Sequence, residues 1–307
     1  MFITYPDRFL TPAYRISPFA TSDIGKNHGL INCSIIDDYF KSRFRGLRFN
    51  YTTNGKQALN IALSHYRLSE NDVVTILTSS GNFYISSCVT NEIEKFCKWS
   101  REILPETKVL FVNHEFGYPY PEIQKLKLLN LPIIEDCAGS FFSEDNECKI
   151  GRTGDFVIYS FPKMFPLQVG GLLVSASHIN HNYTGHIQPR LLRYIKNVLS
   201  EHIQRKDQII RQRIYNYTEL RSRFETLGLR ERFKLEKGIV PGVFMFRIKN
   251  KNLSLPELKT HFWVHGIQSS IFYGEDAFFI PVHQALTAFD LDYFYEVMKV
   301  FLQKADK

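Results

Sequence analysis

The sequence lacks several features that would assign it to a class at once. Its five cysteines are odd in number and form no C-x-x-C pair, so we expect no zinc site and predict reduced thiols in a cytoplasmic protein. No apolar signal-peptide core follows the N-terminus, and no window approaches about 18 uncharged apolar residues. We therefore expect neither secretion nor membrane spanning, and we find no internal repeat or low-complexity linker.

What is present is an ordinary globular composition, with 44% hydrophobic and 22% charged residues among 307. That length and apolar content suit two domains, or one large α/β domain with an appendage. The net charge of +7 comes from 38 basic and 31 acidic residues mixed along the chain. Such a mild excess suits an acidic substrate, an anionic cofactor or a nucleic acid, and does not choose among them.

Short apolar runs predict a sheet before residue 177. The runs are DVVTILTS (72–79), TKVLFVNHEFG (107–117), LPIIEDCAGS (131–140), DFVIYSF (155–161) and GGLLVSA (170–176). Continuous runs such as Val109–Val112 are typical of strands buried on both faces, which indicates a largely parallel sheet covered by helices. NGKQALNIALSHYRL has helical spacing, and the first 50 residues, with three prolines, are expected to be irregular.

The pattern changes beyond about residue 180. Apolar residues between Pro189 and Phe224 recur at steps of three, four or seven, which predicts one long amphipathic helix or two consecutive ones. GVFMFRIKN then predicts a strand, and LPELKTHFWVHG and LDYFYEVMKVFLQ predict helices. We expect a large cofactor-binding domain in residues 1–185 and a smaller α+β domain in residues 186–307.

Two charged residues stand at the ends of apolar strands. Asp136 closes LPIIED, where a carboxylate could pair with a ligand cation, cap the next element or pair with a local arginine. Lys163 follows DFVIYSF in the apolar stretch SFPKMFPLQVGGLL. A desolvated lysine amine can form a Schiff base with an aldehyde, although a lone lysine can also extend its ammonium to solvent.

Two further signals precede them in the chain. Gly55 opens the helix after TTN, where free N–H groups suit a phosphate, or where Asn54 acts as an ordinary cap. Phe83, in SSGNFYIS, could stack on a flat ligand or belong to the core. In this order, the glycine, the aromatic ring, the aspartate and the lysine are the parts that a pyridoxal phosphate enzyme needs.

The motifs around these residues resemble the DegT/DnrJ/EryC1/StrS family of sugar aminotransferases. TTNGKQALNIAL resembles the family's S-G-T-x-A-L-x-x-A-L segment, LPIIEDCAGS its L-P-V-I-E-D-A-A-Q segment, and GRTGDFVIYSFPK…GG its G-x-x-G-D-x-x-x-F-S-F-x-x-x-K…G-G segment. The resemblance covers most of residues 50–175 and returns at 255–300. It implies a three-layer α/β/α large domain of fold type I, with a mostly parallel sheet, and a smaller C-terminal α+β domain.

The resemblance also assigns roles by position. Lys163 would hold pyridoxal 5'-phosphate as a Schiff base, Asp136 would pair with its pyridine nitrogen, and Phe83 would stack on its ring. Gly55 and Ser160 would contact the phosphate, and Tyr273 and His283 would face the substrate. The sequence departs from the family pattern at three places. Lys56 replaces the usual threonine or serine and could supply a cation to the cofactor. Gly139 replaces a glutamine near the ring hydroxyl, and residues 181–197 replace the segment that reaches the partner subunit.

By resemblance, the chain is an aminotransferase that moves an amino group from an amino acid, with glutamate as the expected donor, to a nucleotide-linked keto sugar. Surface polysaccharide or secondary-metabolite biosynthesis would be its setting, and a homodimer its assembly. The alternatives are a cofactor-binding homologue that acts as a regulator or scaffold without transamination, and a pyridoxal-phosphate-dependent sugar dehydratase or isomerase.

Two other classes of ligand are not expected. The basic block His186–Arg223 places its charges between apolar helix positions, as a solvated helix does, so we expect no nucleic-acid binding. His114 and His283 have no second ligand at metal spacing, so we expect no metal and interpret both as structural or substrate-side polar groups.

Overall fold

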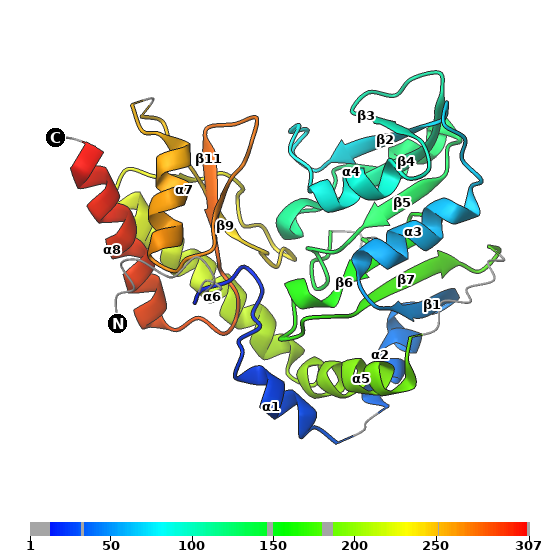
Figure 1. The fold of residues 1–307 in the computed structure, drawn as a ribbon, viewed down its shortest axis with the longest axis horizontal. Coiled ribbons are helices and arrows are strands. Elements are labelled where there is room, and N and C mark those ends of the chain that lie inside the picture. Colours follow the sequence, from blue (N-terminus) through cyan, green and yellow to red (C-terminus); the bar gives the residue numbers. More distant parts are fainter. Residues whose placement is uncertain (1–12, 32–33, 146–149, 180–186, 251, 306–307) are drawn as a thin grey trace.

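The computed structural model describes residues 13–31, 34–145, 150–179, 187–250 and 252–305, which form two sheets with helices around them (Figure 1). The larger sheet consists of β1 (Leu47–Thr52), β2 (Val73–Thr78), β3 (Lys98–Ser100), β4 (Thr107–Asn113), β5 (Ile133–Asp136), β6 (Phe156–Ser160) and β7 (Gly171–Ala176). Its strand order is β1-β7-β6-β5-β4-β2-β3. Within this sheet only β7 runs against its neighbours, so the predicted, largely parallel sheet is confirmed.

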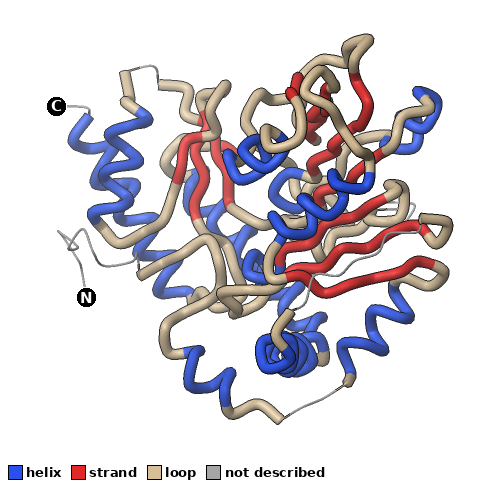
Figure 2. The backbone as a smooth tube through the Cα atoms, turned by 45° about the vertical axis from the view of Figure 1, so that its right-hand side comes forward, coloured by secondary structure: helices blue, strands red, loops and turns tan. Residues whose placement is uncertain are grey.

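Helices cover both faces of this sheet (Figures 1 and 2). The helices around it are α1 (Asp23–His28), α2 (Ile35–Arg43), α3 (Gly55–His65), α4 (Ser87–Ile93) and α5 (Pro189–Ile203), with short 3-10 turns η1 (Glu115–Gly117), η2 (Ile123–Leu129) and η3 (Phe161–Lys163). Alternate residues of β6 face opposite layers: Phe156 and Ile158 pack towards α3, whereas Val157 and Tyr159 pack towards α2 and α5. Strand β6 is therefore buried on both of its faces.

The first 50 residues are more regular than expected. They contain α1, α2 and most of β1, so the prediction of an irregular segment is wrong for the described part of it. Phe40 of α2 is fully buried and stacks on Phe161 with a centroid separation of 6.1 Å. The apolar residues of these helices complete the core beneath β6 and β7.

The C-terminal part has its own sheet and core. Its elements are α6 (Lys206–Glu225), β8 (Arg230–Glu231), β9 (Phe244–Arg247), α7 (Leu255–Val264), β10 (Ser270–Ile271), β11 (Ala277–Ile280) and α8 (Ala288–Ala305). The sheet order is β10-β11-β9-β8, and every pairing in it is antiparallel. None of the helices in the described ranges combines the length and apolar character needed to cross a bilayer.

The predicted long amphipathic stretch forms two consecutive helices, α5 and α6. Helix α5 packs on the large sheet, since Ile195 and Leu199 share the core of Tyr159, whereas Tyr217 in α6 belongs to the C-terminal core. The boundary expected at residue 185 is therefore too early for the packing. We propose that the two domains divide within α6, between Ile209 and Tyr217.

Candidate functional site

The carboxyl ends of β4, β5 and β6 meet at one edge of the large sheet. In the parallel register, Asn113 pairs with Asp136, which in turn pairs with Ile158. The first turn of α3 lies at the same edge, since Gly55 adjoins the last residue of β6. Ligands of open parallel sheets bind at this edge. Four of the residues predicted from the sequence, Gly55, Asp136, Ser160 and Lys163, thus belong to one end of the sheet.

Asp136 is the last residue of β5 and only 6% exposed. Its Oδ1 accepts the N–H of Ala138 at 2.9 Å, and its Oδ2 accepts Asn113 Nδ2 at 2.6 Å. A carboxylate accepts about four hydrogen bonds, so two bonds fix its plane and leave further acceptor capacity. Asp136 is thus preorganised to accept one more donor.

Gly55 and Ser160 face each other across the start of α3. A Cβ on Gly55 would lie 3.3 Å from Ser160 Cβ and 3.8 Å from Ser160 Oγ. Asn54 caps the helix by accepting the N–H of Gln57 at 2.9 Å, so its side chain does not cover the N–H groups of Gly55 and Lys56. The helix start and the serine hydroxyl together form a small polar cradle suited to an anion.

Two glycines bring the neighbouring strand close to this cradle. A Cβ on Gly171 would lie 2.7 Å from Thr52 Oγ1, and one on Gly170, where φ is +105°, would lie 2.9 Å from Phe161. The N–H of Gly170 also donates to the carbonyl of Thr53 at 2.6 Å. Only glycine fits both positions, and the pair lets the Thr52–Asn54 segment approach the end of β6.

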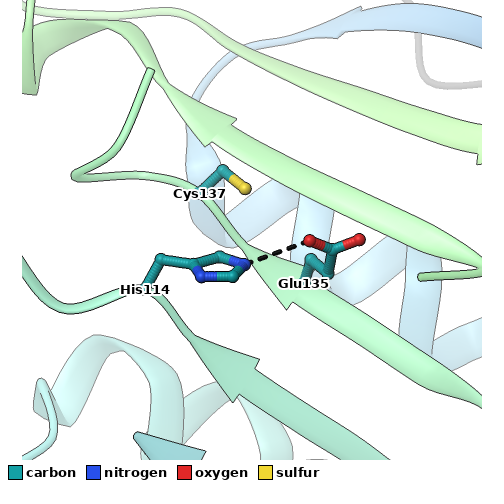
Figure 3. A group of neighbouring side chains, drawn as sticks. All are labelled: His114, Glu135 and Cys137. Carbon is teal, nitrogen blue, oxygen red and sulfur yellow. Dashed lines mark hydrogen bonds and ion pairs between the residues drawn. The ribbon is translucent and has the colours of Figure 1, made fainter. Parts of the chain in front are cut away.

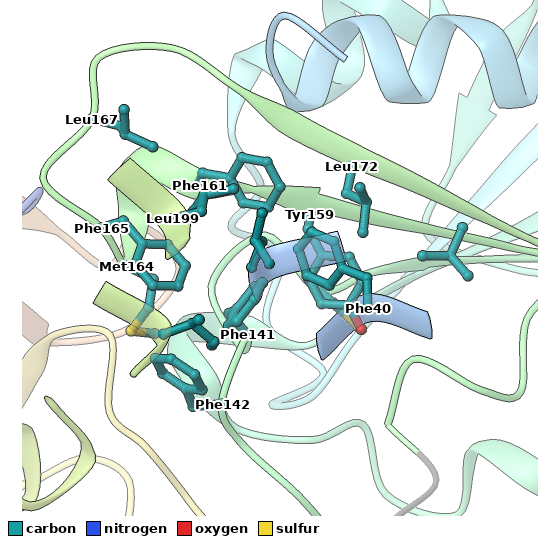
Figure 4. Packing of buried hydrophobic residues seen from close by; sticks show 14 of the residues in the cluster. Phe40, Phe141, Phe142, Tyr159, Phe161, Met164, Phe165, Leu167, Leu172 and Leu199 are labelled. Carbon is teal, nitrogen blue, oxygen red and sulfur yellow. The ribbon is translucent and has the colours of Figure 1, made fainter. Parts of the chain in front are cut away.

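Lys163 ends the η3 turn that follows β6. Its side chain is exposed, whereas Phe161, Met164 and Phe165 are at most 1% exposed and point into the core shown in Figure 4. Of the two alternatives left open for Lys163, the structure shows the side chain that reaches solvent, while its neighbours are buried. The apolar side chains anchor the turn, and the amine leaves it on the solvent side.

Phe83 lies in the loop after β2 and is 65% exposed. The adjacent Asn82 anchors this loop, because its Nδ2 donates to Glu275 Oε1 at 3.2 Å and its backbone N–H is held by Ser80 Oγ. Tyr84 stacks on Tyr273 with an interplanar angle of 11° and a centroid separation of 6.3 Å. The loop therefore leaves Phe83 as an open aromatic face beside the C-terminal domain.

The remaining predicted residues differ in accessibility. Lys56 is exposed on the first turn of α3, and Tyr273 is 49% exposed. His283 is only 6% exposed, and burial, with the charge of Arg213, lowers its pKa to about 3. A neutral, buried imidazole fits the structural interpretation of His283 better than the substrate-side one.

Gly139 accommodates a neighbouring backbone. Its Cβ position lies 3.4 Å from the backbone nitrogen of Phe116 and 3.6 Å from that of Gly117, so η1 occupies the space beside it. A glutamine would have to direct its side chain around this turn. Of the other departure from the family pattern, residues 181–186 lie outside the described residues.

His114, Glu135 and Cys137 form a buried cluster beneath the edge (Figure 3). The expectation that His114 lacks neighbouring ligand-type groups is wrong, because adjacent strands bring them together. His114 Nδ1 accepts the N–H of Tyr120 at 2.9 Å, so Nε2 carries the proton and donates to Glu135 Oε2 at 3.0 Å. The cluster has atoms of the types that bind metals, but both ring nitrogens of His114 already take part in hydrogen bonds within the protein.

Glu135 also accepts backbone N–H groups from Gly151, Thr153 and Gly154 at 2.8, 2.6 and 2.5 Å. Burial by itself would raise its pKa, but the hydrogen bonds from His114 and from the backbone outweigh burial and lower the pKa. Both carboxylate oxygens are thus engaged within the protein. The arrangement ties the 151–154 loop to β5.

Two buried charged residues at the site, Glu115 and Arg213, were not predicted from the sequence. Glu115, 3% exposed, accepts the N–H of Ser80 at 2.6 Å, and burial raises its pKa. Arg213 is fully buried, although the basic block was expected to be a solvated surface. Its position, four residues after Ile209 and four before Tyr217, lies on the buried stripe of α6, and that spacing was the available signal.

The described residues fit pyridoxal phosphate. Gly55, Ser160 and the free N–H groups at the start of α3 suit the phosphate, while the ordered carboxylate of Asp136 suits a pyridinium nitrogen. Phe83 offers an exposed ring in the loop after β2, and Lys163 offers an exposed amine in the turn after β6. The donor set therefore matches each chemical part of this cofactor.

Comparisons with solved structures define the fold. TlmJ, an aminotransferase from Streptoalloteichus hindustanus, superposes with a TM-score of 0.76 at 14% identity, covering 95% of this chain and 99% of that one. The PMP form of the sugar aminotransferase Spr1654, described as putative, from Streptococcus pneumoniae gives 0.70 at 14% identity, covering 98% and 100%. The E. coli GDP-4-keto-6-deoxy-D-mannose-3-dehydratase with bound hydrated PLP gives 0.69 at 14% identity, covering 94% and 100%.

These likenesses define the chain as an α/β protein with the fold of the PLP-dependent aminotransferases. Residues 97–184, which include Asp136, Ser160 and Lys163, match the model of the DegT/DnrJ/EryC1/StrS aminotransferase family. The resemblance found in the sequence is thereby confirmed over residues 97–184. No curated protein matches the sequence.

Proposed function

We propose that this protein is a pyridoxal-phosphate-dependent aminotransferase that transfers an amino group from an amino acid to a keto sugar. The observation that supports the proposal most strongly is the contact of Gly55 with Ser160 beside the ordered carboxylate of Asp136. These residues come from three separate segments and supply the phosphate and pyridine ends of one binding site. The family match over residues 97–184 supports the same conclusion.

Pyridoxal phosphate, when bound, acts as an electron sink for the bonds at the amine-bearing carbon. Asp136 would hold a proton on the pyridine nitrogen, and the cradle at Gly55 and Ser160 would fix the phosphate. Lys163 Nζ would hold the aldehyde end of the cofactor, and the same amine would move a proton at the substrate carbon. Phe83 would cover one face of the ring.

The overall exchange is balanced between the two substrates. The amino acid gives up its amino group and becomes a keto acid, and the sugar gives up its keto oxygen and becomes an amino sugar. We propose glutamate as the donor and a nucleotide-linked keto sugar as the acceptor, in surface polysaccharide or secondary-metabolite biosynthesis. The net charge of +7 suits an acceptor that carries a diphosphate.

We also propose a homodimer in the cytoplasm. Phe83 and Tyr273 are 65% and 49% exposed at the site, and a partner subunit would cover such aromatic surface. Cys88, Cys97 and Cys137 are free thiols, as expected of a protein from a reducing compartment. Sedimentation of the purified protein tests the assembly: a monomer at micromolar concentration would refute this part of the proposal.

The alternative is a homologue that binds the cofactor without transamination. Gly139 favours it, because the family's glutamine is absent there and the backbone of Phe116 and Gly117 packs directly beside the glycine. The experiment combines visible absorption with a donor screen. If the cofactor bound to Lys163 converts to its amine form with glutamate, and a keto acid appears in equal amount, the aminotransferase is supported. If it binds but no amino acid converts it, the alternative is correct.

A further inference from the structure

The backbone of the lysine turn is held by side chains from three distant segments. Three consecutive carbonyl groups each accept one hydrogen bond: Pro162 from Ser17 Oγ at 2.6 Å, Lys163 from Arg213 Nη2 at 3.1 Å, and Met164 from Gln284 Nε2 at 2.9 Å. The donors come from the N-terminal segment, from α6 and from the loop before α8. Buried backbone carbonyl groups are usually hydrogen-bonded, and in this turn the donors are side chains from distant parts of the chain.

Arg213 is the charged member of this set and is 0% exposed. Its Nη1 donates to the carbonyl of Pro241 at 3.1 Å, and its Nε donates to Gln284 Oε1 at 2.8 Å. No carboxylate of the described chain pairs with it, and burial lowers its pKa to about 9. A buried cation without a counterion is costly to retain, so the contacts it makes with the turn need an explanation.

We propose that Arg213, Gln284 and Ser17 are positioning residues that set the direction of the Lys163 amine. The inference rests on the proposed function, because it assumes that Lys163 binds the cofactor's aldehyde. All three donors touch only the backbone of the turn, so the lysine side chain stays free to react. Fixing successive carbonyl groups fixes the peptide planes on both sides of Lys163, and with them the line along which its side chain leaves the chain.

Arg213 and Gln284 also link the lysine to the C-terminal domain. Arg213 binds Pro241, and Gln284 follows β11, so both donors depend on how that domain docks on the large sheet. The large domain alone supplies the core under the turn, but not these donors. Capture of the cofactor by Lys163 thus requires the docked C-terminal domain.

The test measures how fast Lys163 forms a covalent bond with pyridoxal phosphate. The full chain is mixed with the cofactor, samples are reduced with borohydride at intervals, and the mass of the Lys163 peptide reports the bound fraction. This readout needs no substrate and no turnover. The variants are Arg213→Met, Arg213→Lys, Gln284→Met and Ser17→Ala, and the unfolding free energy of each is measured in parallel.

Two matched controls separate positioning from general stability. Arg223→Met removes an arginine from the same helix, one that pairs with Glu219 and Asp292 and does not bond to the turn. Leu220→Ala destabilises the C-terminal core through a buried residue of α6. We expect Arg213→Met to slow the reaction about 10- to 100-fold, because small misplacement of a reacting group costs rates of that order. Both controls should stay within about twofold of wild type.

We expect Arg213→Lys to react faster than Arg213→Met but more slowly than wild type. Gln284→Met and Ser17→Ala should each lower the rate of bond formation about fivefold, which is the effect of losing one hydrogen bond of average strength. Wild-type rates in Arg213→Met would overturn the inference. If Arg213→Met does not fold, wild-type rates in both Gln284→Met and Ser17→Ala would overturn it instead. No adduct in wild type would refute the proposed function itself, which is a different result.

Discussion

The Cβ position of Gly55 lies 3.3 Å from Ser160 Cβ, which joins the start of α3 to the end of β6. Any side chain at position 55 would therefore crowd Ser160. The contact combines a helix N-terminus with a hydroxyl group, two features that bind phosphate in many folds. The first prediction therefore concerns the single methyl group that a change of Gly55 to alanine would add.

Replacing Gly55 with alanine should weaken binding of pyridoxal phosphate about tenfold, because the methyl group crowds Ser160 and the approach of the phosphate. Titration followed by visible absorption measures the dissociation constant, and competition by inorganic phosphate should weaken in parallel. Gly25→Ala is the matched control, since a Cβ there meets nothing within 4 Å. Equal affinities for wild type and Gly55→Ala would show that phosphate binds elsewhere.

The Asp136→Asn variant should still bind the cofactor but should react with the amino donor about 100-fold more slowly or worse. The amide keeps the size of the carboxylate but cannot stabilise a proton on the pyridine nitrogen, and losses of acid–base function are of this order. Stopped-flow absorption of the half-reaction measures the rate. Asp155→Asn, which alters the bond to Ile133 at the opposite end of β5, should keep the wild-type rate.

The Glu135→Gln variant should lose about 3 kcal/mol of unfolding free energy at pH 7, because an amide cannot accept all the hydrogen bonds that the carboxylate accepts. Since the folded pKa of Glu135 is lowered, its contribution is present above the unfolded pKa of about 4.3 and is lost as pH falls through the folded value. Urea unfolding from pH 6 to pH 3 should therefore show a steeper decline for wild type than for the variant. Parallel declines would contradict this role.

A second pH effect should come from His283. Its folded pKa of about 3 lies below the unfolded value of about 6.5, so the unfolded chain binds the extra proton between these values. Stability should fall as pH drops from about 6.5 towards 3, and His283→Asn should reduce that dependence. If the variant and wild type lose stability equally over this range, His283 is not buried in its neutral form.

The hydrogen bond from Asn82 to Glu275 should hold the position of the loop that carries Phe83. Glu275 accepts Asn82 Nδ2 and two donors of Arg232, so Glu275→Gln should loosen the loop and weaken cofactor binding about threefold. Because Glu275 lies at a partly exposed rim, its removal should change the unfolding free energy little. Affinity and stability that fall together would instead indicate a general structural role.

Much of the large sheet could be predicted from the sequence, because β2, β4, β5, β6 and β7 are short apolar runs buried on both faces. Strand β1 was not predicted. It pairs only with β7 at the edge of the sheet and is partly exposed, so its sequence mixes polar and apolar residues. Strand β3, with three residues, is too short for any periodicity to be seen. Edge strands give weak signals for this physical reason.

The candidate site was predicted less completely than the fold. Residues at or just after strand ends, such as Asp136 and Lys163, could be found because parallel strands bring their carboxyl ends together. The exposure of Lys163 could not, since hydropathy describes a stretch and not the direction of one side chain. The bond of Arg213 to the Lys163 carbonyl depends on how α6 docks, which local sequence does not encode.

The central claim is that Lys163 is the amine that binds pyridoxal phosphate. The most direct test adds the cofactor to wild type and to Lys163→Ala, reduces both with borohydride, and locates the modified residue by mass spectrometry. Lys95→Ala is the matched control, because Lys95 is also exposed and pairs with Glu92 away from the start of α3. The account predicts modification at Lys163 in wild type and in Lys95→Ala, and none in Lys163→Ala. An adduct at another lysine, or an unchanged visible spectrum in Lys163→Ala, would contradict it.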